Sequence, residues 1–199
     1  PGRAAARKEA SKLNVPRIGV RFRLPASMNQ VEYFGRGPAE NYLDRNAGSM
    51  VGLYKSTAEE LYFPYVRPQE NGHHTDTRWV SLSTGKKGLL IQADNTIGFN
   101  ALRNSIEDFD DEEATGLSRQ WSNFTPEQVA NHDEAAAKNV LRRQHHINDI
   151  TPRDFVEVCV DLKQQGVAGY DSWGSRPEPA YTLPANREYN WGFTLIPLK

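Results

Sequence analysis

"DFVEVCVDL", residues 154–162, is the clearest β-strand pattern in the chain. Its apolar residues occupy every second position and so share one face of an extended strand. These residues are Val156, Val158, Val160 and Leu162. The pattern is too short and too strictly alternating for an amphipathic helix, so it predicts a strand.

Similar short runs occur along the chain. They are "GVRFRL" (19–24), "VEYF" (31–34), "TRWVSLS" (77–83), "GLLIQA" (88–93), "TIGFNAL" (96–102) and "EYNWGFTLI" (188–196). The third and fourth flank the turn "TGKKG" and predict a hairpin. The last places Tyr189, Trp191, Phe193 and Leu195 on one face. Several short strands between Gly/Pro turns favour an all-β sandwich or barrel, and no strand–helix alternation indicates a parallel sheet.

One segment departs from this pattern. "FTPEQVANHDEAAAKNVLRRQ" (124–144) begins with the helix N-cap signature Thr125, Pro126 and Gln128. It predicts one or two short peripheral helices near 125–142. Residues 1–15 are expected to be a disordered lead-in to a single β-sandwich domain spanning 16–199.

Composition restricts the function. The 199 residues carry 24 basic and 25 acidic side chains, a net charge of −1, which favours neither nucleic acid nor an anionic membrane. No apolar run approaches the ~18 residues of a membrane span, and the first residues lack the apolar core of a signal peptide. The single cysteine, Cys159, allows no internal disulfide and is expected to be a buried thiol.

Few motifs indicate chemistry. The adjacent pairs His73–His74 and His145–His146 would point to opposite faces of a strand, so no metal site is expected. The acidic run "EDFDDEE" (107–113) lacks the spacing and turn glycine of a calcium loop. The chain has no GxSxG, Walker or GxGxxG pattern.

The stretch "GVAGYDSWGSRPEPAY" (166–181) places Trp173 in a loop rich in glycine and proline. A loop tryptophan is either a hydrophobic plug or a flat platform for a sugar ring. Glu70 and Asp171 lie in similar loops, where they either cap backbone, pair with arginines or act on a ligand. In "GRGPAENY", Gly35 and Gly37 are expected to permit unusual backbone angles. Asn41, Glu70 and Asn71 are expected either to satisfy buried loop backbone or to line a pocket or interface.

Three of these stretches occur in a fixed order: "VEYFGRGPAENYLDR" (31–45), "YVRPQENGHHTDTRW" (65–79) and "GVAGYDSWG" (166–174). Together they resemble the C-terminal, small-chain domain of the glycoside hydrolase family 2 β-galactosidases. The resemblance covers most of 15–198 and is weakest across 104–150, which looks like a lineage-specific insertion. It implies a large antiparallel β-sandwich (a supersandwich) of the galactose mutarotase-like type.

The resemblance also implies a site. In the family this domain packs against a (β/α)8 barrel that carries both catalytic glutamates, and it supplies a loop tryptophan, here Trp173, to the galactose pocket. The family usually has Gly-Gly and then an acidic residue in this loop, whereas this chain has Ala168-Gly169 and then Tyr170 and Asp171. The expected substrate-binding residues are Trp173, Asp171, Tyr170, Glu70 and Asn71.

The resemblance implies no catalytic residue in this chain, because the family's catalytic glutamates lie in Asn-Glu or Glu-Tyr-Ala-His contexts. The chain has no Asn-Glu dipeptide, and neither Glu32-Tyr33 nor Glu188-Tyr189 is followed by Ala-His. The expected function is thus a domain of an enzyme that hydrolyses terminal β-D-galactose residues. Its expected partners are a galactoside, the barrel and other domains of the same polypeptide, with no nucleic acid or membrane. No cofactor is expected in this domain, and any divalent or monovalent cations of the full enzyme would bind elsewhere.

Two alternatives stay open: a free-standing carbohydrate-binding module, and a mutarotase-like epimerase with a His–acid pair in its own cleft. The sequence leaves open the oligomeric state, the substrate linkage and the compartment, bacterial cytoplasm or periplasm.

Overall fold

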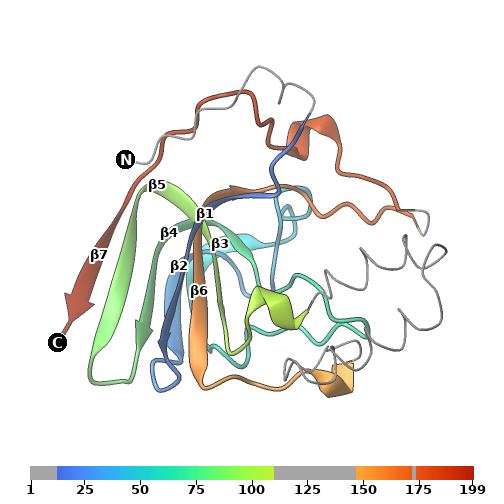
Figure 1. Ribbon diagram of the computed structural model, residues 1–199. Helices are drawn as coiled ribbons and strands as arrows, with labels where there is room; N and C mark the ends of the chain where they lie inside the picture. Colours follow the sequence, from blue (N-terminus) through green and yellow to red (C-terminus); the bar gives the residue numbers. More distant parts are fainter. Residues whose placement is uncertain (1–12, 110–146, 172–173) are drawn as a thin grey trace, which may run out of the picture. The chain divides into compact units, whose positions relative to one another are not determined.

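The computed structural model describes residues 13–109, 147–171 and 174–199. The chain divides into two compact units. The larger, the sheet unit, comprises Pro1–Phe63, Asn71–Arg103 and Arg153–Lys199, and the smaller comprises Pro64–Glu70 and Asn104–Pro152. All described strands lie in the sheet unit (Figure 1): β1 Arg17–Pro25, β2 Gln30–Gly37, β3 Met50–Thr57, β4 His74–Ser83, β5 Gly88–Leu102, β6 Phe155–Gln164 and β7 Phe193–Leu198.

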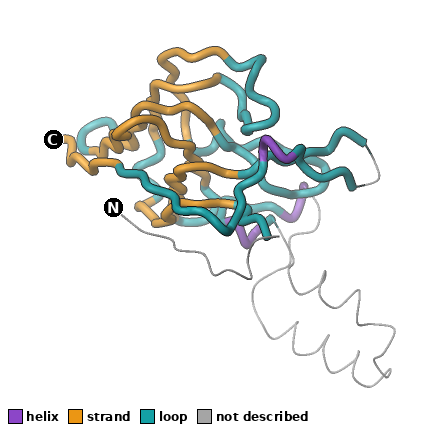
Figure 2. The backbone as a smooth tube through the Cα atoms, turned by 90° about the horizontal axis from the view of Figure 1, so that it is seen from above, coloured by secondary structure: helices purple, strands orange, loops and turns teal. Residues whose placement is uncertain are grey.

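These strands form one antiparallel sheet in the order β1-β6-β5-β4-β2-β3, with β7 also paired to β5. Every neighbouring pair is antiparallel, which confirms the predicted all-β antiparallel class. The described sheet ends at β1 and β3 and is therefore not a closed barrel. Figure 2 shows that helix is confined to short single turns among the described residues.

Strand β5 organises the sheet because it has different partners along its length. Its residues 88–93 pair with β7, and 98–102 pair with β6, while β4 pairs along the other side. The register with β4 shifts between Thr77, opposite Ile97, and Trp79, opposite Gln92. Such irregularities bend a strand. The two strands predicted at 88–93 and 96–102 are thus one strand with an irregularity at their junction.

The core lies against one face of β2, β4, β5 and β6. Its central side chains are no more than 2% exposed: Val31, Tyr33, Val80, Leu82, Ile91, Phe99, Val156, Val158 and Val160. The Tyr33 ring meets Phe99 edge-on, with centroids 5.0 Å apart. Burying a side chain of this size contributes about 1.5–3 kcal/mol each, so this cluster is the main source of stability for the sheet unit.

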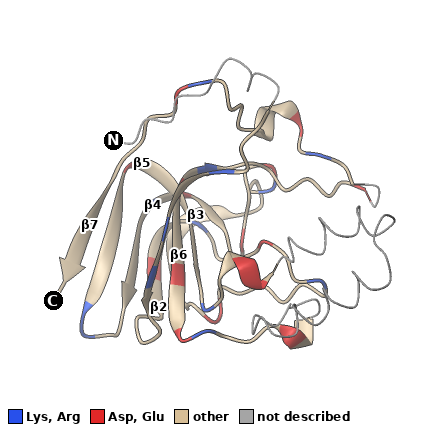
Figure 3. Cartoon of the chain, viewed as in Figure 1, with Lys and Arg blue, Asp and Glu red and all other residues tan. Residues whose placement is uncertain are grey.

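The stretch that predicted the fold, β6, is buried on both faces. Glu157, Cys159 and Asp161 alternate with the core valines and are also at most 3% exposed. Charged side chains are rarely buried without partners, and β1 supplies these. Arg21 and Arg23 bind Glu157, and Arg17 binds Asp161 at 3.0 Å. Figure 3 shows the basic residues of β1 beside the acidic residues of β6. The prediction of a buried Cys159 is confirmed.

The structure differs from the predicted strands at two places. Strand β3 was not predicted, because apolar residues occupy both of its faces and Gly52 interrupts them. The last strand begins at Phe193 rather than at 188, because its partner β5 becomes irregular after Ala93. The helices predicted near 125–142 and most of the 1–15 lead-in lie outside the described residues.

The described part of the smaller unit contains two single turns of 3-10 helix, η2 (Ile106–Asp108) and η4 (Ile147–Asp149). The Ser105 amide donates to the Asp108 carboxylate at 2.9 Å. The Asn104 side chain donates to the Thr151 carbonyl at 3.0 Å. A third turn, η5 (Pro179–Tyr181), belongs to the sheet unit. No helix in the described part of the chain is long and apolar enough to cross a membrane.

Candidate functional site

The loop after β2, residues 38–49, is called the hub loop here because it contacts the other two motifs. Its Asn41 side chain is fully buried. The Asn41 Oδ1 accepts from the amide and the hydroxyl of Thr75, at 2.9 and 2.6 Å. Its Nδ2 donates to the carbonyls of Arg36 and Ala39, both at 3.1 Å. Asn41 thus ties the hub loop to the start of β4, as predicted for a side chain that satisfies loop backbone.

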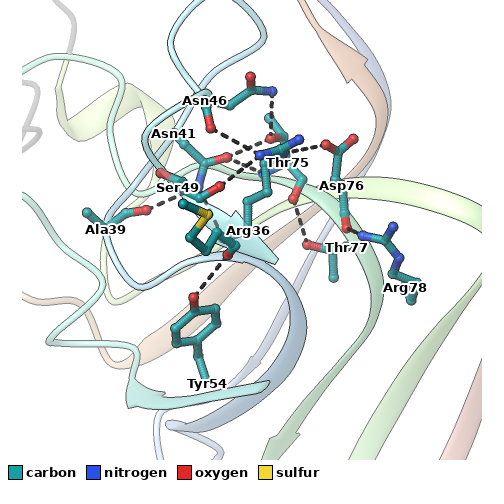
Figure 4. A network of polar contacts seen from close by, with 11 residues as sticks. Arg36, Ala39, Asn41, Asn46, Ser49, Tyr54, Thr75, Asp76, Thr77 and Arg78 are labelled. Atoms are coloured by element: carbon teal, nitrogen blue, oxygen red, sulfur yellow. Dashed lines mark hydrogen bonds and ion pairs between the residues drawn. The ribbon is translucent and has the colours of Figure 1, made fainter. Parts of the chain in front are cut away.

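Arg36 supports the same loop from β2 (Figure 4). Its Nη1 donates to the carbonyl of Ser49 at 2.8 Å and to that of Asn46 at 3.3 Å. Its Nε pairs with the carboxylate of Asp76, whose backbone has a positive φ of 51°. A guanidinium with several fixed acceptors holds a loop more firmly than a flexible ammonium group does. The Arg36 side chain therefore holds the C-terminal part of the hub loop against β2 and β4.

Glu40 links the hub loop to the second motif. Its Oε2 accepts from the backbone amide of Gly72 at 2.6 Å and from the Tyr42 hydroxyl at 3.3 Å. Its Oε1 pairs with Arg45 at 2.8 Å. The Asn41 amide adds a backbone bond to the His73 carbonyl at 2.7 Å. Residues 40–42 and 71–75 are thus joined by both side chains and backbone.

Asp44 links the hub loop to the third motif. One carboxylate oxygen accepts from the Val167 amide at 3.1 Å, and the other accepts from the Ala168 amide at 2.7 Å. The three motifs, which are far apart in the sequence, therefore meet at residues 38–49 of the sheet unit.

Space, rather than backbone angle, explains the two glycines of "GRGP". Neither Gly35 nor Gly37 has a positive φ. A Cβ on Gly35 would lie 2.4 Å from Oγ1 of Thr77, and one on Gly37 would lie 2.3 Å from the Tyr33 hydroxyl. The expectation of unusual backbone angles at these positions was wrong, because close packing excludes a side chain there.

Four of the five predicted site residues are described, and they lie in different surroundings. Tyr170 is 57% exposed, and Asp171 is exposed beside it. Asp171 accepts from the Ser175 amide at 3.3 Å, and the Ser175 hydroxyl accepts from the Tyr170 amide at 3.0 Å. These bonds join Tyr170 and Asp171 to Ser175; Trp173 lies outside the described residues.

The other two residues come from "RPQENG". Asn71 is 2% exposed. Its Oδ1 accepts from the Phe63 amide at 3.2 Å, and its carbonyl accepts from Asn100 at 2.7 Å. Asn71 thus forms hydrogen bonds with loop backbone, which is one of the two roles expected for it from the sequence. Glu70 is half-buried and belongs to the smaller unit.

The sequence matches the model of the family described as "Beta galactosidase small chain" over residues 3–195. The chain belongs to this family. It is 35% identical over 185 residues to a beta-galactosidase of Priestia megaterium, covering 92% of this chain and 15% of that protein. It is 42% identical over 99 residues to one of an Arthrobacter species, covering 47% of this chain and 10% of that protein. A Vibrio cholerae beta-galactosidase is 29% identical over 181 residues, covering 91% of this chain and 14% of that protein.

The chain therefore spans 10–15% of the length of these beta-galactosidases. The match extends through all three motifs, so the loops that meet at the hub loop are part of the small-chain family sequence.

A buried polar network, which was not predicted from the sequence, connects His73 of the second motif to strands β1, β5 and β6 of this small-chain domain. Asn100 Oδ1 is 2.8 Å from His73 Nδ1 and 2.7 Å from Nη2 of Arg17, which also binds Gln164 at 2.7 Å. Arg17 pairs in turn with the fully buried Asp161. The sequence does show arginines in the strand at 17–25 and acidic residues in the strand at 155–164. Only the pairing of these two strands in the fold reveals that the two sets of charges face each other.

The two adjacent histidines of the second motif have separate neighbours. His73 stacks on Tyr42, whereas His74 packs against Tyr33 and Phe99. Burial lowers the pKa of His73 to about 3, and the Arg17 guanidinium acts in the same direction. Burial also lowers the pKa of His74. Both rings are neutral at neutral pH and only 1% exposed, so neither is accessible as the acid or base of an epimerase.

The described residues contain no group of three or more His, Cys, Asp or Glu side chains that could hold a metal ion. A groove of about 410 Å³ lies between β2, β3 and β4 and is lined by residues such as Glu32, Lys55 and Ser81. None of the four described site residues, Tyr170, Asp171, Glu70 and Asn71, lines this groove. The exposed 166–171 loop on its hub-loop support is therefore the candidate functional site.

Proposed function

We propose that this chain is the C-terminal domain of a glycoside hydrolase family 2 β-galactosidase. The domain completes the galactose pocket with Trp173 and lacks the catalytic glutamates. The observation that supports the proposal most strongly is that all three motifs meet at the hub loop. Asp44 in the hub loop binds the backbone amides of Val167 and Ala168, which lie five to six residues before Trp173 in the sequence. The names of the relatives give the substrate class.

The chemistry of this loop suits a sugar. One face of a galactose ring is mainly C–H and stacks on an indole, while its hydroxyls need polar partners at the rim. Exposed Tyr170 and Asp171 lie three and two residues before this tryptophan and offer such partners. Stacking of this kind contributes about 0.5–1.5 kcal/mol beyond the burial of area, which is enough to orient a ring but not to bind it alone.

An exposed apolar row supports the presence of a covering domain. Leu53, Phe34 and Trp79 are direct neighbours across β3, β2 and β4, and they share the face opposite to the core. Leu53 is 59% exposed and Phe34 38% exposed. Next to them, Val51 is 41% exposed. Contiguous apolar surface of this kind is typical of an interface, as expected for a domain that packs against other parts of a longer enzyme.

The proposal is tested by hydrolysis of an aryl β-galactoside. The purified chain alone should release no aglycone, because retaining hydrolysis requires two suitably spaced carboxylates that the proposal assigns to the barrel. The polypeptide in which this chain follows a family 2 barrel should hydrolyse it, and deletion of the chain should abolish that activity. Hydrolysis by the chain alone would overturn the proposal.

Substitution Trp173→Ala in the complete enzyme should raise KM for a galactoside about 2- to 12-fold, the equivalent of losing 0.5–1.5 kcal/mol of stacking. Trp191→Phe is the control, because the Trp191 ring packs on Phe193 of β7 and is not one of the proposed substrate-binding residues. Steady-state kinetics in which Trp173→Ala leaves KM unchanged, or in which both variants change KM equally, would contradict this role.

A further inference from the structure

The Asp44 carboxylate lies at the entry to the candidate loop. Its two oxygens accept separately from two consecutive backbone amides, those of Val167 and Ala168, at 3.1 and 2.7 Å. Hydrogen bonds to an ionised acceptor are about twice as strong as neutral ones. The 123 and 124 residues between the partners make this a tertiary contact rather than a local turn.

The backbone of residues 166–168 has a conformation that fits the Asp44 carboxylate. A Cβ on Gly166 would lie 2.5 Å from Oδ2 of Asp44, so glycine leaves the space that the carboxylate occupies. Ala168 has a positive φ of 55°, which side chains disfavour. A residue in this conformation persists only where its surroundings impose it, and its own amide is held by Asp44.

The next residues are directed by the same anchor. After Ala168, Gly169 also has a positive φ, of 84°, and the chain then reaches exposed Tyr170 and Asp171. Desolvation raises the pKa of the Tyr170 phenol, and the negative charge of Asp44 adds to this rise. The Asp44 charge thus acts on the exposed side chain of Tyr170 as well as on the backbone of the loop.

We infer that Asp44 is a positioning residue for substrate: by clamping the amides of Val167 and Ala168, it sets the path of the 166–171 loop and the presentation of Tyr170 and Asp171, two of the proposed substrate-binding residues. The consequence for kinetics rests on the proposed function, whereas the clamp itself does not. Because the loop is proposed to bind the sugar equally in the ground state and the transition state, loss of this clamp should raise KM more than it lowers kcat.

The clamp is tested first in the chain alone by amide hydrogen exchange. In Asp44→Ala and in the isosteric Asp44→Asn, the amides of Val167 and Ala168 should exchange about tenfold faster or more, since each loses a charge-assisted bond. Asp154→Asn, at an exposed aspartate just before β6, is the matched control and should leave both amides unchanged. Unchanged exchange in a folded Asp44 variant would overturn the inference.

Gly166 provides an independent test of the geometry. Gly166→Ala should displace the Asp44 carboxylate and accelerate exchange at the same two amides, because its Cβ needs the space of Oδ2. In the Asp44→Ala background the same substitution should have little further effect, since the space is then empty. Additive effects in the double variant would show that the two residues act separately and would overturn the clamp.

The functional arm uses the complete enzyme with an aryl β-galactoside. Asp44→Asn should raise KM about fivefold or more with kcat changed less than about twofold, and Asp154→Asn should change neither. Altered exchange with unchanged KM would overturn the positioning role. A wild-type enzyme that needs no part of this chain would instead refute the proposed function, and the exchange experiment would still decide whether Asp44 clamps the loop.

Discussion

His73 shows how one residue depends on its whole environment. Its ring is stacked on Tyr42, bonded to Asn100 and close to the Arg17 guanidinium. The sequence identified "HH" only as a poor metal site, because periodicity says which face a residue occupies but not what covers that face. In the fold, the ring is a neutral part of the buried polar network.

The low pKa of His73 predicts a pH-dependent stability. Its folded pKa, about 3, lies below the unfolded value of 6.5. The unfolded chain therefore binds a proton that the folded chain does not, and stability is lost as pH falls from about 6.5 towards 3. The loss approaches about 1.4 kcal/mol per pH unit within this window.

Urea unfolding of wild type and His73→Gln between pH 7 and 3.5 measures this term. The variant should be less stable at pH 7, and the difference between the two proteins should shrink as the pH falls. His74 is common to both and cancels in the comparison. Parallel stability curves over this range would contradict a neutral, buried His73.

The roles of individual residues at the candidate site could be predicted from the sequence only in part. The roles of Asn41 and Asn71 in holding loop backbone were predicted correctly, because asparagine in Gly/Pro-rich loops commonly bonds to local backbone. Asp44 was missed. Its partners lie more than 120 residues away, and only the fold brings them together.

Among the elements, β5 shows why the sheet has its particular connectivity. The strand serves β7 at one end and β6 at the other, with an irregular stretch between them. Local alternation predicted both halves, since each half has its own period of two. It could not join them, because the register shift against β4 disturbs the period at the junction.

Gly98, in the second half of β5, is the position where this element accommodates the buried network. A Cβ at this site would lie 2.5 Å from Cε1 of the His73 ring. Gly98→Ala should destabilise the chain by about 1–3 kcal/mol through overpacking. Gly48→Ala, where a Cβ would meet nothing within 4 Å, is the matched control and should change stability by less than about 1 kcal/mol. Equal denaturation midpoints for the two variants would contradict this account.

For the whole molecule, the family and its fold were accessible from sequence, because three long motifs and the strand periods agree. The described strands form one sheet whose two edges differ in chemistry. At one edge, β1 carries arginines, a register irregularity and a terminal proline. At the other, β3 pairs with β2 in unbroken register and exposes Met50, Val51 and Leu53. Natural sheets usually protect such an edge, which fits a covering domain.

The isolated chain should therefore self-associate through β3 and its apolar row. Leu53→Lys should shift it towards the monomer in sedimentation or light-scattering measurements at equal concentration, because it places a charge on the edge strand at the most exposed residue of the row. Lys163→Ala on β6, at the other side of the sheet, is the control. Identical association of wild type and Leu53→Lys would show that this surface does not mediate self-association.

A last consequence follows from the bonds between Arg103 and Arg153. Arg103 donates from Nε and Nη2 to the carbonyl of Arg153 at 2.9 and 2.6 Å, and its own carbonyl accepts from the Arg153 amide. The strands before and after residues 104–152 are thus fastened to each other at the point where the chain leaves and re-enters the sheet unit. The segment between these two arginines should therefore tolerate changes in length and sequence during evolution without a change in the register of β5 and β6. It should also be replaceable by a designed module.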